Sequence, residues 1–375
     1  MRSIADEMKY IYQQDDWANF FWNDVLVLTK LAEVKARQGY LLGQMSNLGF
    51  EIQNRTLLDI LATNIQKSSE IEGANLDATQ IRSSIARKLN IEYTPQIAVS
   101  RNVEGAVEVT IDALENYNSE ITIDRLFGWH AALFPIGYSS MYKIETGKFR
   151  TDIHGAMQVV SGYLGYEKVH YEAPPASTLS FEMERFLQYA NSSTESTDDL
   201  IKAAIIHLWF VILYPFEDGN GRIARALTEI FLKRSDKSHF RFYSLSDEIM
   251  RHRKEYYSIL EETQTGTLDV THWILWFLNT LQDAMKNSNT LLKKVIKISE
   301  FWSKYNMTHF NERQNKIIKM LLNDFHGNLT SSKWAKICKC SQDTASRDIN
   351  DLISKKILRK EGNGRNVHYV FTDAS

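Results

Sequence analysis

The sequence predicts a mainly α-helical protein, and three observations support this prediction. The 375-residue chain contains only five prolines, so long helices can form without interruption. Apolar residues recur at helical spacing, for example along residues 26–42 and 57–71. One stretch of the middle part differs, because β-branched and aromatic residues flank a central Gly162 in residues 157–171. That pattern indicates a single β-hairpin among helices.

Changes of pattern along the chain predict four segments. Residues 1–93 form a helical N-terminal extension that ends at a turn-like break, and residues 94–285 form a helical core domain with the hairpin. Residues 286–310 are expected to be a helical linker, and residues 311–375 a separate C-terminal domain.

The C-terminal segment has the pattern of a winged helix-turn-helix domain. A first helix is marked by apolar residues 317–322, a second by a Thr330 or Ser331 cap, and a third by a Ser341 cap. Two short strands follow, joined by a glycine-containing turn at residues 361–365. Three helices followed by a hairpin make a winged helix.

Composition and charge exclude several classes of protein. The net charge of −2 gives no overall attraction to nucleic acid or membranes. The two cysteines, Cys338 and Cys340, cannot build a disulfide framework, which fits a reducing, cytoplasmic location. The N-terminus lacks the apolar core of a signal peptide, and no apolar run is long enough for a membrane helix, so no membrane association is expected.

A loop at residues 213–225, which reads L-Y-P-F-E-D-G-N-G-R-I-A-R, carries the chemistry. The two glycines let the backbone approach an anion, and the helix that follows directs its free N–H groups at the loop. The aspartate suits Mg²⁺, and the arginines can bind phosphate oxygens. No P-loop pattern is present. The loop is therefore predicted to bind a metal-bound polyphosphate through Asp218, Gly219, Asn220, Gly221, Arg222 and Arg225.

This loop resembles the active-site motif of Fic-domain proteins, H-P-F-x-(D/E)-G-N-G-R-x-x-R, at every specified position except the first, which is Tyr214 here. Residues 17–20, 38–43 and 128–134 also look like parts of the family's helical extension and core. The resemblance implies a protein adenylyltransferase, in which a hydroxyl of an unknown target protein, or of the chain itself, attacks the α-phosphorus of ATP. AMP is then transferred and pyrophosphate leaves.

The resemblance also implies a role for each residue of the loop. Asp218 would hold Mg²⁺, and the amides of residues 219–221 with the Asn220 side chain would cradle the phosphates. Arg222 would stabilise the leaving phosphates, and Arg225 would bind the γ-phosphate.

Tyr214 stands where the family has its general base. Imidazole suits that task near neutral pH, whereas a phenol is ionised in roughly one molecule per thousand at pH 7. Because base catalysis typically contributes about 10²- to 10⁴-fold, we expect Mg·ATP binding with slow or absent AMP transfer. Alternatives are an aromatic plug at the loop's entrance, a phenol whose pKa is depressed by Arg225 or Mg²⁺, and an engineered or accidental substitution. His207, on the same helix face, is interpreted as a core or pocket histidine.

Residues 68–73, S-S-E-I-E-G, resemble the family's inhibitory motif (S/T)-x-x-x-E-(G/N), with Ser68, Glu72 and Gly73 at its specified positions. Glu72 would pair with Arg225 and leave ATP misaligned. In some family members this glutamate also positions water to remove AMP, so a deAMPylase is an alternative. The alternative is that Glu72 is an ordinary solvated glutamate at the end of a helix.

The 157–171 hairpin resembles the family's flap, which docks a target segment by strand addition. Val159, Val160 and Gly162 would lie nearest the nucleotide and target, unless the hairpin merely packs on helices. Tyr256 and Gln264 resemble adenine-site residues of the family, although helical tyrosines can equally belong to the core.

Residues 329–371 contain nine basic and four acidic residues, a basic patch in a near-neutral chain. Arg347 on the third helix and Arg365 at the wing are the candidate DNA contacts. A protein-docking or homodimerisation module is the alternative. The rival to the enzyme is thus a catalytically inactive regulator that senses nucleotide and binds DNA.

Overall fold

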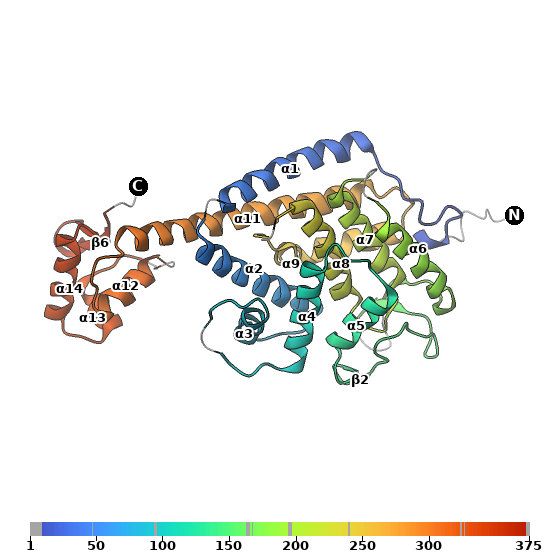
Figure 1. Ribbon diagram of the computed structural model, residues 1–375, viewed down its shortest axis with the longest axis horizontal. Coiled ribbons are helices and arrows are strands. Elements are labelled where there is room, and N and C mark those ends of the chain that lie inside the picture. The colour runs from blue at the N-terminus through green and yellow to red at the C-terminus, as the bar shows by residue number, and fades with distance from the viewer. Residues whose placement is uncertain are drawn as a thin grey trace. The chain divides into compact units, whose positions relative to one another are not determined.

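A computed structural model of the chain describes residues 10–46, 48–93, 96–162, 166, 168–193, 197–238, 241–322, 325 and 327–372, apart from the side chains of residues 51, 289–291, 294, 299 and 365. It divides into two compact units, Met1–Leu292 and Lys293–Ser375. Both are built mainly from helices, which confirms the predicted fold class (Figure 1).

The first unit contains two 3-10 turns, eleven α-helices and two β-hairpins within its described residues. The helical elements are η2 (Ile11–Gln13), α1 (Asp24–Ser46), α2 (Phe50–Ile71), α3 (Ala78–Lys88), α4 (Arg101–Glu115), α5 (Ile123–Leu133), η3 (Ala176–Thr178), α6 (Leu179–Asn191), α7 (Asp199–Leu213), α8 (Asn220–Asp236), α9 (Leu245–Arg251), α10 (Arg253–Gln264) and α11 (Thr271–Lys304). The predicted linker, residues 286–310, falls mostly within the last part of α11.

Helix α7 lies in the core of this unit, beside α8 (Figure 1). Every residue from Leu200 to Leu213 is buried, because the helix is apolar on nearly all faces. Asp198 caps its start by accepting a hydrogen bond from the Leu200 N–H at 2.8 Å. The chain thus leaves a rigid helix directly into the glycine-containing loop.

Helices α4 and α5 cross at very short range. A Cβ atom added to Gly105 of α4 would lie 1.8 Å from the carbonyl oxygen of Ala132 on α5. Only a residue without a side chain permits this approach. The crossing holds α5 and the residue that follows it, Phe134, close to the start of α8.

The predicted hairpin is present as the antiparallel strands β3 (Gln158–Ser161) and β4 (Lys168–Glu172), with an irregularity between Val159 and Val160. A shorter hairpin, β1 (Tyr138–Ser139) with β2 (Tyr142–Lys143), was not predicted, because two-residue strands carry no readable alternation.

The second unit has the predicted order of three helices and a hairpin around its own core. Its elements after α11 are α12 (Glu312–Leu322), α13 (Ser331–Cys338), α14 (Gln342–Ser354), β5 (Leu358–Glu361), η4 (Gly364–Asn366) and β6 (His368–Phe371). Trp334 is fully buried at its centre. Thr330 and Ser341 cap α13 and α14 through hydrogen bonds of 3.2 Å from the amides of Lys333 and Thr344. Within the described residues, no helix has the length and apolarity needed to span a membrane.

Candidate functional site

The loop between α7 and α8 turns through two left-handed residues. Tyr214 ends α7 at φ 44°, and Gly219 precedes α8 at φ 80°. Glycine adopts this conformation without strain. A Cβ on Gly219 would also lie 2.8 Å from the ring of Phe134. The loop therefore requires a glycine there for both its backbone and its neighbour.

The Asn220 side chain holds the loop in shape. Its Oδ1 accepts from the Phe216 N–H at 3.0 Å, and its Nδ2 donates to the Phe216 carbonyl at 2.8 Å. Phe216 is buried and stacks on the His130 ring with centroids 4.3 Å apart. The sequence assigned the Asn220 side chain to the anion cradle, whereas in the structure both of its ends bind the loop itself.

Arg150 braces the same loop from outside, and the sequence analysis missed it. Its Nε donates to the Tyr214 carbonyl at 2.7 Å, and its backbone N–H donates to the Pro215 carbonyl at 2.9 Å. Its remaining nitrogens bind Asp152 and the carbonyl of Pro174. The residue lies in an irregular segment 64 positions before Tyr214, so no sequence pattern could have revealed it.

Asp218 is the carboxylate of the loop that could hold a metal ion. Its Oδ1 accepts from the Gly219 N–H at 2.6 Å, and its Oδ2 accepts from the Ser139 hydroxyl of β1. No group of three or more His, Cys, Asp or Glu side chains suited to a metal occurs among the described residues. A single oxygen ligand completed by phosphate oxygens is the usual arrangement for Mg²⁺, so the site fits Mg²⁺ brought with a nucleotide.

Arg225 of α8 binds the end of α2. Its Nη2 donates to Glu72 Oε1 at 2.8 Å and to the Ser68 carbonyl at 2.7 Å, and its Nε donates to the Ser68 hydroxyl at 2.8 Å. Burial lowers the pKa of Arg225, but the Glu72 carboxylate, with Tyr256 and Tyr257, more than reverses this and the net shift is upward. The guanidinium is therefore charged and its partner is an internal anion.

The Glu72 carboxylate also reaches the start of α8. A Cβ added to Gly221 would lie 2.0 Å from Glu72 Oε1, so the carboxylate rests against bare backbone in the first turn of that helix. Helix N-termini favour anions through their unpaired N–H groups and dipole. Gly73, which follows Glu72, takes a left-handed φ of 78° that ends the segment.

Donor groups remain at this site for a further anion. Arg222 Nε and Arg225 Nη1 are buried and have no hydrogen-bond partner among the described residues. The Arg222 guanidinium lies 4.7 Å from the centroid of the Phe134 ring, and burial lowers its pKa. Orphaned buried donors are costly unless a ligand satisfies them.

The Tyr214 phenol is held in its neutral form. Burial raises its pKa far above the usual value, and the nearby Glu72 carboxylate and Tyr257 raise it further, while Arg225 opposes them. Its ring lies 6.2 Å from that of Tyr171. This environment is the reverse of the one that would depress a phenol pKa.

His207 and the two residues assigned to the adenine site are buried with their polar ends engaged. His207 contacts Thr228 Oγ1 at 3.0 Å and the Tyr256 hydroxyl at 2.9 Å, and burial lowers its pKa to about 3. Gln264 Nε2 donates to the Val211 carbonyl at 3.0 Å. His207 is thus a neutral, hydrogen-bonded core histidine.

The β3–β4 hairpin presents Val160 to solvent with 48% of its surface exposed, Val159 half-buried, and Gly162 at a φ of 114°. His170 of β4 ties it to α10 through a 2.8 Å contact with Glu261. In the second unit, Arg347 is exposed on α14, and the side chain of Arg365 lies outside the described residues.

Comparison with known proteins gives two family matches. The model of the Fic/DOC family matches residues 120–232, and that of a domain of unknown function, DUF4172, matches residues 10–91. The first range contains the whole loop, and the second contains the segment of Glu72.

Curated relatives are similar over part of their length. The protein adenylyltransferase Fic of Culex quinquefasciatus is 26% identical over 54% of this chain and 37% of its own. The protein adenylyltransferase fic-1 of Caenorhabditis elegans is 29% identical over 41% of this chain and 26% of its own. The chain therefore spans well under half the length of these relatives.

Two solved structures share the fold. A Fic family protein from Desulfovibrio desulfuricans superposes with a TM-score of 0.53 at 18% identity, over 95% of this chain and 98% of that one. A Fic domain containing signaling protein from Bacteroides thetaiotaomicron gives 0.51 at 19% identity, over 72% of this chain and 97% of that one.

Proposed function

The chain is a Fic-domain protein, and on that premise we propose that it is a Mg·ATP-binding protein adenylyltransferase whose transfer step is held back by Glu72 and by Tyr214. One observation carries the proposal. An internal carboxylate already occupies the glycine-lined start of α8 and pairs with Arg225, so this site is built to hold an anion.

The transfer needs a hydroxyl, a triphosphate and a path for one proton. The target oxygen would attack the α-phosphorus, forming a new P–O bond while the bond to the oxygen that bridges to the β-phosphorus breaks. AMP would stay on the target and pyrophosphate would leave. Arg222 and Arg225, with the amides of residues 219–221, would hold the phosphate oxygens. Mg²⁺, held by Asp218, would neutralise phosphate charge when bound.

This chain departs from its family at Tyr214, the residue in the position that would accept the proton. The attacking hydroxyl must lose a proton, and a phenol whose pKa is raised cannot accept it near neutral pH. We therefore expect nucleotide binding to persist while transfer is slow. Tyr214 then acts as an aromatic residue at the entrance of the loop.

Glu72 supplies a second restraint. It occupies Arg225, the group assigned to the γ-phosphate, so ATP must either displace it or bind with its phosphates misplaced. Arg225 releases three hydrogen bonds to α2 when the carboxylate and Ser68 move away.

A four-protein assay tests the proposal. Wild type, Glu72→Gly, Tyr214→His and the double variant are incubated with Mg²⁺ and ATP labelled at the α-phosphate, with a cell extract as the source of targets. We expect label above background in the double variant and about 10²-fold less or none in wild type. Adding Asp218→Ala to the double variant should abolish the label. Robust transfer by wild type would contradict the role given to Tyr214, and a silent double variant that also fails to bind ATP would contradict the enzyme.

A DNA-binding role is supported by one separate observation in the second unit. The outward face of α14 is polar and exposed, as a recognition helix requires. Its residues are Gln342, Ser346, Arg347 and Asn350. A gel shift with genomic fragments that weakens with salt and is lost in Arg347→Ala would favour a regulator.

Removal of AMP is the remaining alternative, because Glu72 lies beside the same anion site. It would appear as loss of label from a modified target that depends on Glu72. The target protein is expected to be recognised at the β3–β4 hairpin, near Val160 and Gly162.

A further inference from the structure

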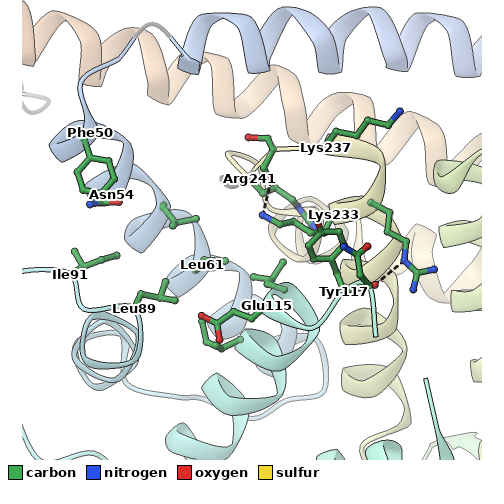
Figure 2. A pocket seen from close by; sticks show the side chains of 16 residues that line it. Phe50, Asn54, Leu61, Leu89, Ile91, Glu115, Tyr117, Lys233, Lys237 and Arg241 are labelled. Carbon is green, nitrogen blue, oxygen red and sulfur yellow. Dashed lines mark hydrogen bonds between the residues drawn. The ribbon is translucent and has the colours of Figure 1, made fainter. Parts of the chain in front are cut away.

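A cavity of about 790 Å³ opens in the first unit between α2, the end of α4 and the end of α8 (Figure 2). It lies apart from the loop, where the space beside Arg222 and Arg225 measures only about 20 Å³. Its volume falls within the range of small-molecule sites, roughly 300–1,000 Å³.

One wall of this cavity is apolar and incompletely covered. Leu57 of α2, Leu114 of α4 and Ile91 line it and stay partly exposed. Phe50, at the start of α2, is 71% exposed. Figure 2 shows Phe50 and Leu61 projecting from α2 on one side. Covering such surface stabilises a complex by roughly 25 cal/mol per Å².

The opposite wall is basic. Lys233 and Arg241 lie together there, beside Tyr117 (Figure 2). The Lys233 ammonium donates to the Ser238 carbonyl at 2.7 Å, while Arg241 forms an ion pair with the buried Glu229. Burial lowers the pKa of Lys233 and the charge of Arg241 lowers it further, while Asp236 opposes them without reversing the shift. A bound anion would relieve this repulsion.

The lining also contains an acidic residue, Glu115, at the end of α4 (Figure 2). The negative charge of Glu115 makes the α4 side of the cavity unfavourable for an anion. The polar end of a ligand therefore belongs at Lys233, and its apolar end against α2.

We propose that this cavity is a binding site for an amphipathic anion, a molecule with an apolar body and one acid group. The apolar body would cover Leu57, Leu114 and Phe50. The acid group would face Lys233.

The cavity shares its two main helices with the contact between Glu72 and Arg225. Leu57 and Leu61 face the cavity, and Ser68 and Glu72 follow them at helical spacing along the same stripe of α2. Between them, Asn64 donates to Glu229 at 3.3 Å.

On α8, Glu229 follows Arg225 by one turn and pairs with Arg241 at the cavity wall. Polar contacts thus join α2 to α8 at two places within the described residues, one beside the cavity and one at the anion site. A ligand that fits the cavity in this arrangement stabilises α2 in its docked position. This regulatory part rests on the proposed function: the ligand would strengthen the hold of Glu72 on Arg225.

The site is tested with a pair of fluorescent probes that differ in charge. 8-Anilinonaphthalene-1-sulfonate carries the acid group, and N-phenyl-1-naphthylamine has the same rings without it. We expect the sulfonate to bind wild type more tightly, and Lys233→Met to weaken it about tenfold while leaving the neutral probe unchanged. Lys202→Met is the matched control, because Lys202 is also a buried lysine that donates to a carbonyl, of Ser192 at 2.7 Å, but does not line the cavity.

Leu114→Trp, which fills the cavity from α4, is the second variant and should abolish binding of both probes. If Lys233→Met and Leu114→Trp both bind the sulfonate as tightly as wild type, the proposed site is wrong. Equal loss of both probes in Lys233→Met would overturn the anionic specificity.

Coupling is measured without relying on catalysis. Hydrogen exchange of the amides of residues 65–72 should slow when the sulfonate binds wild type, and should not change in Leu114→Trp. Unchanged exchange with saturated probe would overturn the regulatory part. Titration of Mg·ATP should show about fivefold weaker binding with the probe present. If ATP binds neither wild type nor Glu72→Gly, the proposed function fails, and the exchange measurement still decides the coupling.

Discussion

Tyr214 combines a strained backbone with a ring beside the anion site. A bulky residue at positive φ is uncommon and persists only where its surroundings hold it. Here the holding group is Arg150, whose guanidinium binds the Tyr214 carbonyl from a buried position. The shape of the loop therefore depends on a residue outside the motif.

Replacing Arg150 with methionine should destabilise the first unit by about 2–4 kcal/mol, because the carbonyls of Tyr214 and Pro174 lose this donor and Asp152 loses its ion-pair partner. Urea unfolding followed by tryptophan fluorescence measures the change. Lys148→Met removes an exposed charge two residues away and should cost less than about 0.5 kcal/mol. Equal midpoints for the two variants would refute the bracing role.

Lys202 gives a pH-dependent prediction. Burial lowers its pKa from 10.5 to about 8, whereas the unfolded chain keeps the ordinary value. Between pH 8 and 10.5 the unfolded state therefore binds more protons, and stability rises with pH. Compared with wild type, Lys202→Met should show a flatter dependence from pH 8 to 9.5, with a total difference of up to about 3 kcal/mol across the full shift. Urea unfolding at each pH measures the free energy of unfolding. If it changes with pH equally in wild type and Lys202→Met, the Lys202 ammonium is solvated in the folded state and the prediction is wrong.

At the scale of elements, α2 acts as a clamp on α8 through its last turn. The predicted pairing of Glu72 with Arg225 concerned one contact, but Ser68 adds two more. The Glu72 carboxylate and the hydroxyl and carbonyl of Ser68 therefore all help to hold α2 against α8.

Ser68→Ala should therefore raise the affinity for Mg·ATP about three- to tenfold, since one hydrogen bond to a charged group no longer opposes the release of Arg225. Calorimetric titration measures the effect. Thr63→Ala is the matched control, because that hydroxyl donates only to the Asp59 carbonyl of its own helix. An unchanged affinity in Ser68→Ala would mean that ATP binds without moving α2.

The sequence predicted elements whose cause is local, and missed arrangements that depend on distant neighbours. Helices α1, α2 and α14, the Thr330 and Ser341 caps and the β3–β4 hairpin follow from periodicity and capping residues near each element. Arg150 and the loop-binding role of Asn220 could not be predicted, because they depend on which backbone atoms the fold brings within reach. The cavity is formed by several separate segments, so no single motif marks it.

At the scale of the whole molecule, the two units have separate cores, and the anion site belongs entirely to the first. Trp334→Ala should cost the second unit about 3–5 kcal/mol, comparable to the total stability of a small domain. We expect a low-temperature unfolding transition in calorimetry, with Mg·ATP affinity unchanged. Lys336→Ala, an exposed neighbour on α13, should leave the thermogram as in wild type. A fall in nucleotide affinity in Trp334→Ala would show that the units depend on each other.

The close crossing at Gly105 has a consequence for how this protein can change. The smallest side chain added there would push α5 outward, and with it the Phe134 ring on which Arg222 rests. A mutation of Gly105, more than a hundred residues before the motif, would in this way change the affinity for a nucleotide that this residue does not contact. Differences in nucleotide affinity among related chains are therefore expected to depend on the distance between the α4 and α5 backbones as well as on the residues of the motif.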